Sequence, residues 1–362
     1  MEKIVSSEEL HGIFDFASKQ KRSLPTQAFS EFLIKREQGD WAEDLIFRAI
    51  NEVENDIIAV KYGKSDKIVA GEPGFDKFYK SYQDELEQIG KRPDLLIFRK
   101  SDYSQLKKDY NLSDLDISSL DNCKLKYIVP RAIAGLEIRS SSYLVDKYNE
   151  VSSKNRKEVI NQIIKLINEL KNKEDSLPDE WKKWLLTIDI NNEKTLFDKP
   201  RSPVKVKSIK ELTELKKLID SLKIKKRDFL SFTPKVEDIY VIYKWIKTFG
   251  VPHYYVQVFF DKVYIISFKR ILEIISNPSK NEKIFYIEKN SKNQFKTTIH
   301  IDINQGFLLA EKNDFPTHAS KYKELEKGKL LFYVVFSGGK AYLNVEKLYE
   351  IIGFSLDKNN TK

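Results

Sequence analysis

The chain has 362 residues, a formal net charge of +9, 41% hydrophobic residues and 32% charged residues. This balance is typical of a globular protein and excludes a disordered chain, and the length allows one large domain or two. No apolar run approaches the roughly 20 residues that span a bilayer, and the first nine residues contain early acids and no apolar signal core. We therefore expect a cytoplasmic protein without a membrane partner. The single cysteine, Cys123, excludes an intramolecular disulfide framework and a zinc site built from several thiolates.

The positive charge points to a nucleic-acid partner, although it is a weak indication by itself. Only 11 of the 63 basic residues are arginine, so the excess consists of lysine. A lysine-rich composition can also reflect an AT-rich genome. The charge therefore needs support from a site.

Residues 1–142 predict helices followed by two buried strands. Residues 1–60 read as helical, with a break near residues 23–26 and a second helix beginning around residue 39. Its helical spacing continues over residues 41–58, and Glu43 lies in its first turn, where a carboxylate suits the helix dipole. A further helix is expected near residues 75–89.

Two short apolar runs, residues 95–98 and 132–138, read as buried strands. The polar connection between them contains a predicted short helix at residues 103–110. The alternation over residues 124–129 favours another strand.

Residues 143–230 differ in character and predict a helical insertion. The pattern is amphipathic over residues 154–170 and helical over residues 209–222, and Trp181 and Trp184 should anchor the insertion.

Residues 231–270 are expected to complete the core, and residues 271–362 to form a β-rich part. Thr233 is a good N-cap, Pro234 suits the first helical position, and the helix should end at Gly250. The small residues at 337–340 indicate a hairpin, and a short helix ends the chain. Strands are predicted at residues 254–260, 263–268, 284–288, 297–303, 330–336 and 341–345.

Two carboxylates lie at the edges of the first two buried strands. Asp94 precedes the first strand, and Glu137 lies within the second, two residues before Arg139. A carboxylate is costly to bury alone, so a cation or a metal ion should accompany each. Two such acids on neighbouring strands suit Mg²⁺, which takes a few carboxylate oxygens and often a phosphate oxygen. Arg139 projects from the same face of its strand as Glu137 and could offset charge on a reacting phosphate.

Pro93-Asp94, a strand, and then Glu137-Ile138-Arg139 with small polar residues after it resemble the PD-(D/E)xK nuclease superfamily. The resemblance covers residues 39–268 and implies a restriction-endonuclease-like α/β core, with a central mixed sheet flanked by helices. More narrowly, residues 228–268 resemble type II restriction endonucleases of the AccI kind.

The resemblance implies Mg²⁺-dependent hydrolysis of DNA phosphodiesters that leaves 5′-phosphates. Asp94 and Glu137 correspond to the two metal-binding acids, and Glu43 to an auxiliary acid on the preceding helix. The usual lysine is Arg139 here, which stays protonated and therefore stabilises charge without acting as a base. The gap between the two acids is longer than usual, so Glu237, with Lys235 beside it, is an alternative ligand.

Candidate DNA contacts are less sharply defined. Lys235 reads either as a catalytic or DNA-backbone cation or as part of a charged first turn. His253 resembles a metal ligand or general base, but the other histidines are far away in sequence without ligand spacing, so a packed or DNA-contacting histidine is favoured. The remaining candidates are Ser140, Ser141 and Lys262. The lysines of the insertion suit phosphate contact, but for any single one a solvated helix face is the favoured interpretation: Lys154, Lys157, Lys205, Lys207, Lys223, Lys225 and Lys226.

The sequence thus predicts a type II restriction endonuclease that requires Mg²⁺ and cuts double-stranded DNA as a homodimer, since two-fold protein symmetry matches a palindromic site. Its cellular partner would be a cognate DNA methyltransferase. Residues 143–230 would contribute to DNA binding, and residues 271–362 to recognition or dimer contacts. The alternatives are a repair, homing or transposon-type nuclease with the same core, and a non-catalytic DNA-binding protein in which Asp94 and Glu137 are structural ion-pair partners.

Overall fold

The computed structural model describes residues 28–53, 56–64, 68–112, 114–172, 177–189, 194–200, 209–222, 229–277, 284–289 and 297–355. By their contacts, these residues divide into two compact units. One unit comprises the residues up to Leu144 together with those from Phe229 onward, and the other comprises Val145–Asp228.

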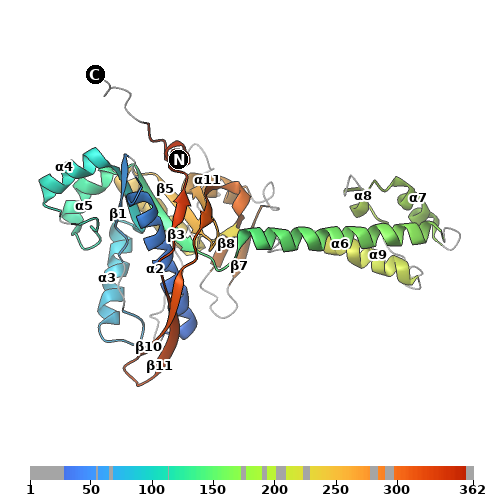
Figure 1. Ribbon diagram of the computed structural model, residues 1–362, viewed down its shortest axis with the longest axis horizontal. Helices are drawn as coiled ribbons and strands as arrows, with labels where there is room; N and C mark the ends of the chain where they lie inside the picture. Colours follow the sequence, from blue (N-terminus) through green and yellow to red (C-terminus); the bar gives the residue numbers. More distant parts are fainter. Residues whose placement is uncertain are drawn as a thin grey trace. The chain divides into compact units, whose positions relative to one another are not determined.

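A seven-stranded mixed sheet forms the centre of the first unit (Figure 1). The strands lie in the order β1-β2-β3-β5-β6-β9-β12; β3 and β5 pair in parallel, and the other neighbours are antiparallel. The bounds are β1 Ile57–Lys61, β2 Leu95–Arg99, β3 Ala134–Ser140, β5 His253–Val258, β6 Val263–Ser267, β9 Phe307–Asn313 and β12 Ala341–Leu343.

Helices cover both faces of this sheet, which confirms the predicted fold class. The helices α2 and α13 share one apolar core with it, and α4, α5 and α10 contribute to a second core. The helix bounds are α2 Ser30–Asn51, α3 Phe75–Gln88, α4 Lys100–Tyr110, α5 Asn122–Ile128, α10 Val236–Phe249, α11 Phe268–Ile275 and α13 Val345–Ile352, with short 3₁₀ turns at Val129–Arg131 and Ile303–Gln305.

The two cores explain why β2 has the sequence Leu-Leu-Ile-Phe. Successive side chains of a strand point to opposite faces, so Leu95 and Ile97 join the α2 core while Leu96 and Phe98 join the α10 core. A strand buried on both faces needs apolar residues at every position.

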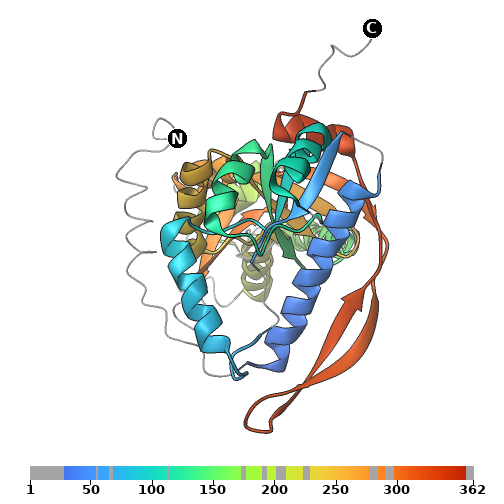
Figure 2. The same ribbon diagram turned by 90° about the vertical axis from the view of Figure 1, so that its left-hand side faces the viewer.

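The C-terminal part is β-rich, as predicted. A three-stranded sheet has the order β4-β8-β7, and a two-stranded ribbon pairs β10 with β11. Figure 2 shows this ribbon alongside α2, with which β11 makes extensive contact. The bounds are β4 Ser231–Phe232, β7 Phe285–Lys289, β8 Thr297–Asp302, β10 Thr317–Glu324 and β11 Leu330–Ser337.

The described part of the second unit is helical. It contains α6 Val145–Lys171, α7 Asp179–Thr187, α8 Lys194–Phe197 and α9 Lys210–Leu222. Trp181 and Trp184 meet edge to face, with ring centroids 5.3 Å apart, and both are buried among the leucines and isoleucines of α6 and α9. The predicted helices over residues 154–170 and 209–222 and the anchoring role of the two tryptophans are confirmed.

The predicted strand over residues 124–129 is wrong, because α5 occupies this segment. The Asp121 carboxylate accepts a hydrogen bond from the Lys124 backbone N–H at 2.9 Å and caps the helix. Leu125 and Ile128, three residues apart, are its buried positions.

The boundary expected near Gly39 is also wrong, since α2 runs through this glycine and Glu43 lies in its interior. The helix ends at Asn51, before the predicted limit of residue 58. The Asn51 side chain pairs with the N–H and C=O of Ala59, both at 2.9 Å, so it acts as a short strand partner for β1. The predicted helix over residues 1–27 lies outside the described residues.

Two further turns differ from expectation. Helix α10 begins at Val236 after an N-cap at Lys235, because the preceding Pro234 carbonyl accepts from Ile299 N–H of β8 and keeps the chain extended. Residues 337–340 do not close a hairpin, because β11 pairs with β10 and β12 with β9. Instead, the Gly338 carbonyl accepts hydrogen bonds from Trp41 Nε1 and Arg48 of α2.

Candidate active site

The pairing of β2 with β3 brings the two predicted acids together. Leu95 pairs with Leu136 in an antiparallel register, and one further step places Asp94 opposite Glu137. Opposite residues of antiparallel strands project to the same face, here the face that α10 covers. Asp94 Oδ2 accepts a hydrogen bond from the Ile138 backbone N–H at 2.6 Å.

Glu137 is almost completely buried, with 1% of its surface exposed, and two cations bind one of its oxygens. Oε1 lies 2.6 Å from Lys91 Nζ and 2.5 Å from Arg139. Burial opposes ionisation of Glu137, but Lys91 and Arg139 outweigh it and hold its pKa below the usual value. The second oxygen, Oε2, is buried and accepts no hydrogen bond from the residues that the structure describes.

Lys91 reaches the site because the chain crosses α10 at close range just after α3. Gly90 has φ +85°, and a Cβ there would lie 2.3 Å from the Val241 carbonyl oxygen, so only glycine fits without displacing α10. The next residue donates its backbone N–H to the same carbonyl at 2.9 Å. Lys91 Nζ then lies 2.9 Å from Asp238 Oδ2.

Asp238, in the first turn of α10, completes the cluster. Its Oδ2 also lies 3.4 Å from Arg139, so Lys91, Glu137, Arg139 and Asp238 form a closed ring of alternating charges. Burial opposes ionisation of Asp238, but Lys91, Lys235 and Arg139 together depress its pKa below the usual range. Burial also opposes protonation of Lys91, yet Asp238 and Glu137 raise its pKa, so the ammonium stays charged.

Two acids outside the ring, Asp94 and Glu43, have raised pKa values instead. Burial and then the charge of Glu137 raise the pKa of Asp94 from 3.8 to about 7. Burial, followed by Asp94, Asp40 and Glu137, raises the pKa of Glu43 well above its usual value. Glu43 therefore belongs to the same electrostatic cluster, although it comes from α2.

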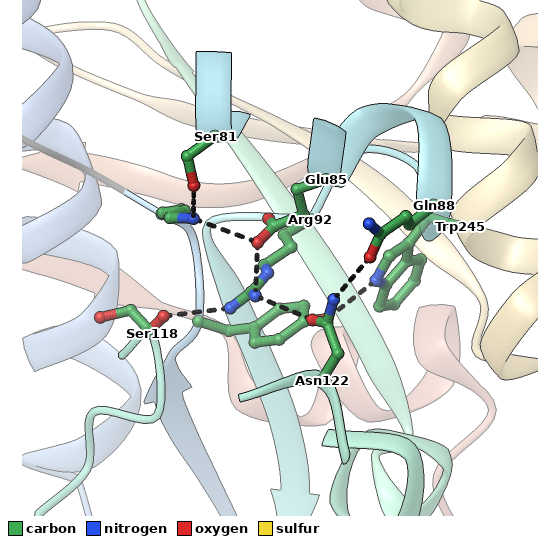
Figure 3. Close-up of polar contacts among 9 residues, drawn as sticks. Ser81, Glu85, Gln88, Arg92, Ser118, Asn122 and Trp245 are labelled. Atoms are coloured by element: carbon green, nitrogen blue, oxygen red, sulfur yellow. Dashed lines mark hydrogen bonds and ion pairs between the residues drawn. The ribbon is translucent and has the colours of Figure 1, made fainter. Parts of the chain in front are cut away.

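Arg92 and Pro93, which precede Asp94, have a structural role. Arg92 is buried, lies 2.8 Å from the Glu85 carboxylate, donates to the Ser118 carbonyl at 3.0 Å and stacks over the Tyr62 ring (Figure 3). These contacts tie α3 and the segment before α5 to the start of β2. The motif thus fixes the position from which Asp94 projects.

His253 is buried with 2% exposure beside Trp245, Tyr255 and Phe268. Burial lowers the pKa of His253 to about 4, so the imidazole is neutral at pH 7. Because the side chain is buried, it does not lie at a surface that DNA could reach in this conformation. His253, Tyr255 and Gln257 alternate along β5 on the face that carries Glu137, and each has a buried polar atom without a partner among the described residues.

The structure thus brings together four of the predicted catalytic residues, Asp94, Glu137, Arg139 and Glu43, and places Lys235 beside Asp238. Ser140 and Ser141 follow them at the end of β3, half-buried. Lys262 lies between β5 and β6, where its ammonium donates to the Glu311 carbonyl at 3.2 Å. Of the insertion lysines, Lys157 is exposed on α6. The side chains of the others lie outside the described part.

Sequence reasoning missed Lys91 and Asp238. It singled out Glu237, whose carboxylate instead accepts a hydrogen bond from the Thr297 backbone N–H at 3.4 Å. The helical spacing contained the correct signal, because Asp238 lies four residues before Ile242 and seven before Trp245, on the buried stripe. No comparable signal marks Lys91.

The acids fit a hard divalent cation. Glu137 Oε2 is a buried acceptor without a partner among the described residues, and Asp94 and Glu137 repel each other. In the described part of the chain, no three acidic, histidine or cysteine side chains converge as a ligand set. Mg²⁺ does not need three, since it commonly binds one or two carboxylates and completes its shell with waters and phosphate oxygens.

The fold and site define an α/β protein with a buried acid–cation cluster on the inner strands of a mixed sheet. The sequence profile of the AccI restriction endonuclease matches residues 1–359, so the chain belongs to the AccI restriction endonuclease family and is a DNA endonuclease. No curated protein and no solved structure matches it significantly. Among the described residues, no helix is long and apolar enough to cross a membrane.

Proposed function

We propose that the chain is a Mg²⁺-dependent type II restriction endonuclease with a PD-(D/E)xK-type site, which hydrolyses double-stranded DNA at a specific sequence and leaves 5′-phosphates. The observation that carries this proposal is the pairing of Asp94 with Glu137, in which one buried carboxylate oxygen has no partner in the described structure. Mg²⁺ bound there would supply electrostatic stabilisation of the phosphate and activation of a water.

The residues of the chain have separate roles in this proposal. Asp94 and Glu137 would hold the cation, and the backbone N–H of Ile138 orients Asp94. Arg139, one quarter exposed, is the cation that can reach a scissile phosphate from the ring. Asp238 and Glu137 keep Lys91 and Arg139 protonated, so both stabilise negative charge and neither accepts a proton. Glu43 is an auxiliary acid.

The remaining parts would serve DNA recognition. A homodimer would read a palindromic site and cut both strands, and a cognate methyltransferase would protect the same site in the host. Residues 143–230 would contribute phosphate contacts, and residues 271–362 recognition or dimer contacts.

The test is incubation of the protein with plasmid DNA in Mg²⁺ or in EDTA, with Asp94→Ala as the inactive variant. Asp109→Asn, which alters an exposed acid on α4, is the matched control. We expect discrete fragments with 5′-phosphates from wild type and control in Mg²⁺ only. Random degradation would indicate a non-specific nuclease, and cleavage by Asp94→Ala as efficient as that of wild type would refute the site.

A further inference from the structure

The four residues of the ring carry balanced charges. Lys91 and Arg139 contribute two positive charges, and Glu137 and Asp238 two negative charges, through contacts of 2.5 to 3.4 Å. Asp94 and Glu43 lie outside the ring but within its electrostatic reach. When both are ionised they carry two negative charges, which is the charge that one divalent cation neutralises.

We propose that Asp238 is a positioning residue that balances the charge of the ring, so that a divalent cation can bind beside Glu137 while two protonated cations remain next to it. This inference rests on the proposed function. Asp238 Oδ2 contacts Lys91 and Arg139, so in this proposal it compensates these two cations and is not a ligand of the metal.

The geometry explains why a second acid is needed in the ring. Lys91 and Arg139 both bind the same oxygen of Glu137, and without Asp238 the ring itself would carry one net positive charge. Like charges a few ångströms apart in a buried site repel strongly. That surplus would oppose a divalent cation and favour a phosphate anion. The consequence is an opposite effect on two ligands, which general damage to the fold would not produce.

The first experiment measures Mg²⁺ binding by calorimetry and DNA binding by fluorescence anisotropy in EDTA, using the full chain. Asp238→Asn should weaken Mg²⁺ binding about tenfold, as for other residues that support metal ligands. DNA binding in EDTA should stay equal or become tighter. If Mg²⁺ binding is unchanged, or if both ligands bind more weakly, the proposal is overturned.

Lys91→Met gives the opposite prediction and covers the case in which Asp238→Asn does not fold. Methionine keeps an unbranched stem without the charge, so the ring has one surplus negative charge. Mg²⁺ should bind more tightly and DNA in EDTA more weakly. The double variant restores neutrality and should return Mg²⁺ affinity to the wild-type value. Weaker Mg²⁺ binding in Lys91→Met, or no recovery in the double variant, would contradict the proposal.

Matched controls neutralise charges outside the ring. Asp109→Asn alters an exposed acid, and Lys347→Met breaks an exposed pair with Glu350 at 2.7 Å. Neither should change Mg²⁺ or DNA binding. If wild type does not bind Mg²⁺, or if Asp94→Asn binds it as well as wild type, the proposed function fails. If wild type binds it through Asp94 but Asp238→Asn has no effect, only the role of Asp238 fails.

Discussion

Asp94 Oδ2 accepts a hydrogen bond from the Ile138 backbone N–H at 2.6 Å, so the acid that precedes β2 is bonded to the strand that carries Glu137. The bond fixes Asp94 through the backbone of β3, whatever side chain stands at residue 138. The two acids therefore keep their relative position even though 43 residues separate them in sequence. This preorganisation is what a site that binds a cation with two carboxylates requires.

Arg139 should contribute to the rate of cleavage as a fixed positive charge. Arg139→Ala should lower kcat by about 10²–10³-fold, the usual cost of removing one preorganised charge stabiliser. Arg139→Lys keeps the charge but loses the planar guanidinium, so its loss should be smaller. Single-turnover cleavage of a plasmid substrate measures both. Arg270→Ala, which removes a surface pair with Glu273, is the control, and equal rates for wild type and Arg139→Ala would refute the role.

Asp94 should make the metal-free protein less stable as the pH rises. Its pKa is raised from 3.8 to about 7 in the folded chain, so the folded state binds more protons between these values and the free energy of unfolding falls with increasing pH. Asp94→Asn removes this dependence and should raise the melting temperature in EDTA, with a difference that grows from pH 5 to pH 8.

The contribution of Asp238 to stability has the opposite pH dependence. Its depressed pKa stabilises the fold above the unfolded value of 3.8, and this contribution is lost only as the pH falls through the lower folded value. Asp238→Asn should therefore destabilise the protein across pH 5–8 by a nearly constant amount. Thermal scans of both variants and wild type at three pH values measure the two pH dependences. If the melting-temperature difference between Asp94→Asn and wild type did not vary with pH, the prediction for Asp94 would be contradicted.

Arg92→Ala should destabilise the first unit strongly. Among the described residues, it leaves Glu85, 9% exposed, with Lys64 at 3.4 Å as its ion-pair partner, and it removes the contacts that hold the start of β2 (Figure 3). Breaking a buried ion pair typically costs about 3–5 kcal/mol, against about 1 kcal/mol or less for an exposed pair such as Arg270–Glu273. Urea unfolding of Arg92→Ala and Arg270→Ala should show this contrast.

Gly90→Ala should disturb the site through the backbone. The new Cβ would meet the Val241 carbonyl and the Trp245 nitrogen at 2.3 and 2.5 Å, so Lys91 must shift away from α10. Gly250 is the matched control, because it also has a positive φ but no atom within 4 Å of a Cβ. Gly250→Ala should cost about 1 kcal/mol from strain alone. Gly90→Ala should cost more and weaken Mg²⁺ binding; equal effects would refute the close-approach argument.

The sequence predicted the pairing of Asp94 and Glu137 because both lie next to apolar runs whose strand character is a local property. It also predicted the insertion helices, whose buried positions follow helical spacing. It failed where a distant partner decides the conformation. Residues 337–340 have the composition of a hairpin turn, yet Trp41 and Arg48 of α2 donate hydrogen bonds to the glycine carbonyls there.

Lys91 and Asp238 were missed for the same reason. Their roles arise from a contact between segments 147 residues apart, which no local pattern encodes. Asp238 could have been identified from its place on the buried stripe of α10, whereas Lys91 depends on the crossing at Gly90.

The ring of Lys91, Glu137, Arg139 and Asp238 can form only late in translation, because Asp238 is the last of its residues to be synthesised. Arg139 and Asp238 are 99 residues apart, so a ribosome that has already made both strand acids must still add the whole Val145–Asp228 unit before the ring can close. A nascent chain stalled or released before that point carries the two strand acids without the aspartate of α10. Early termination products therefore lack the aspartate that balances Lys91 and Arg139 in the full chain.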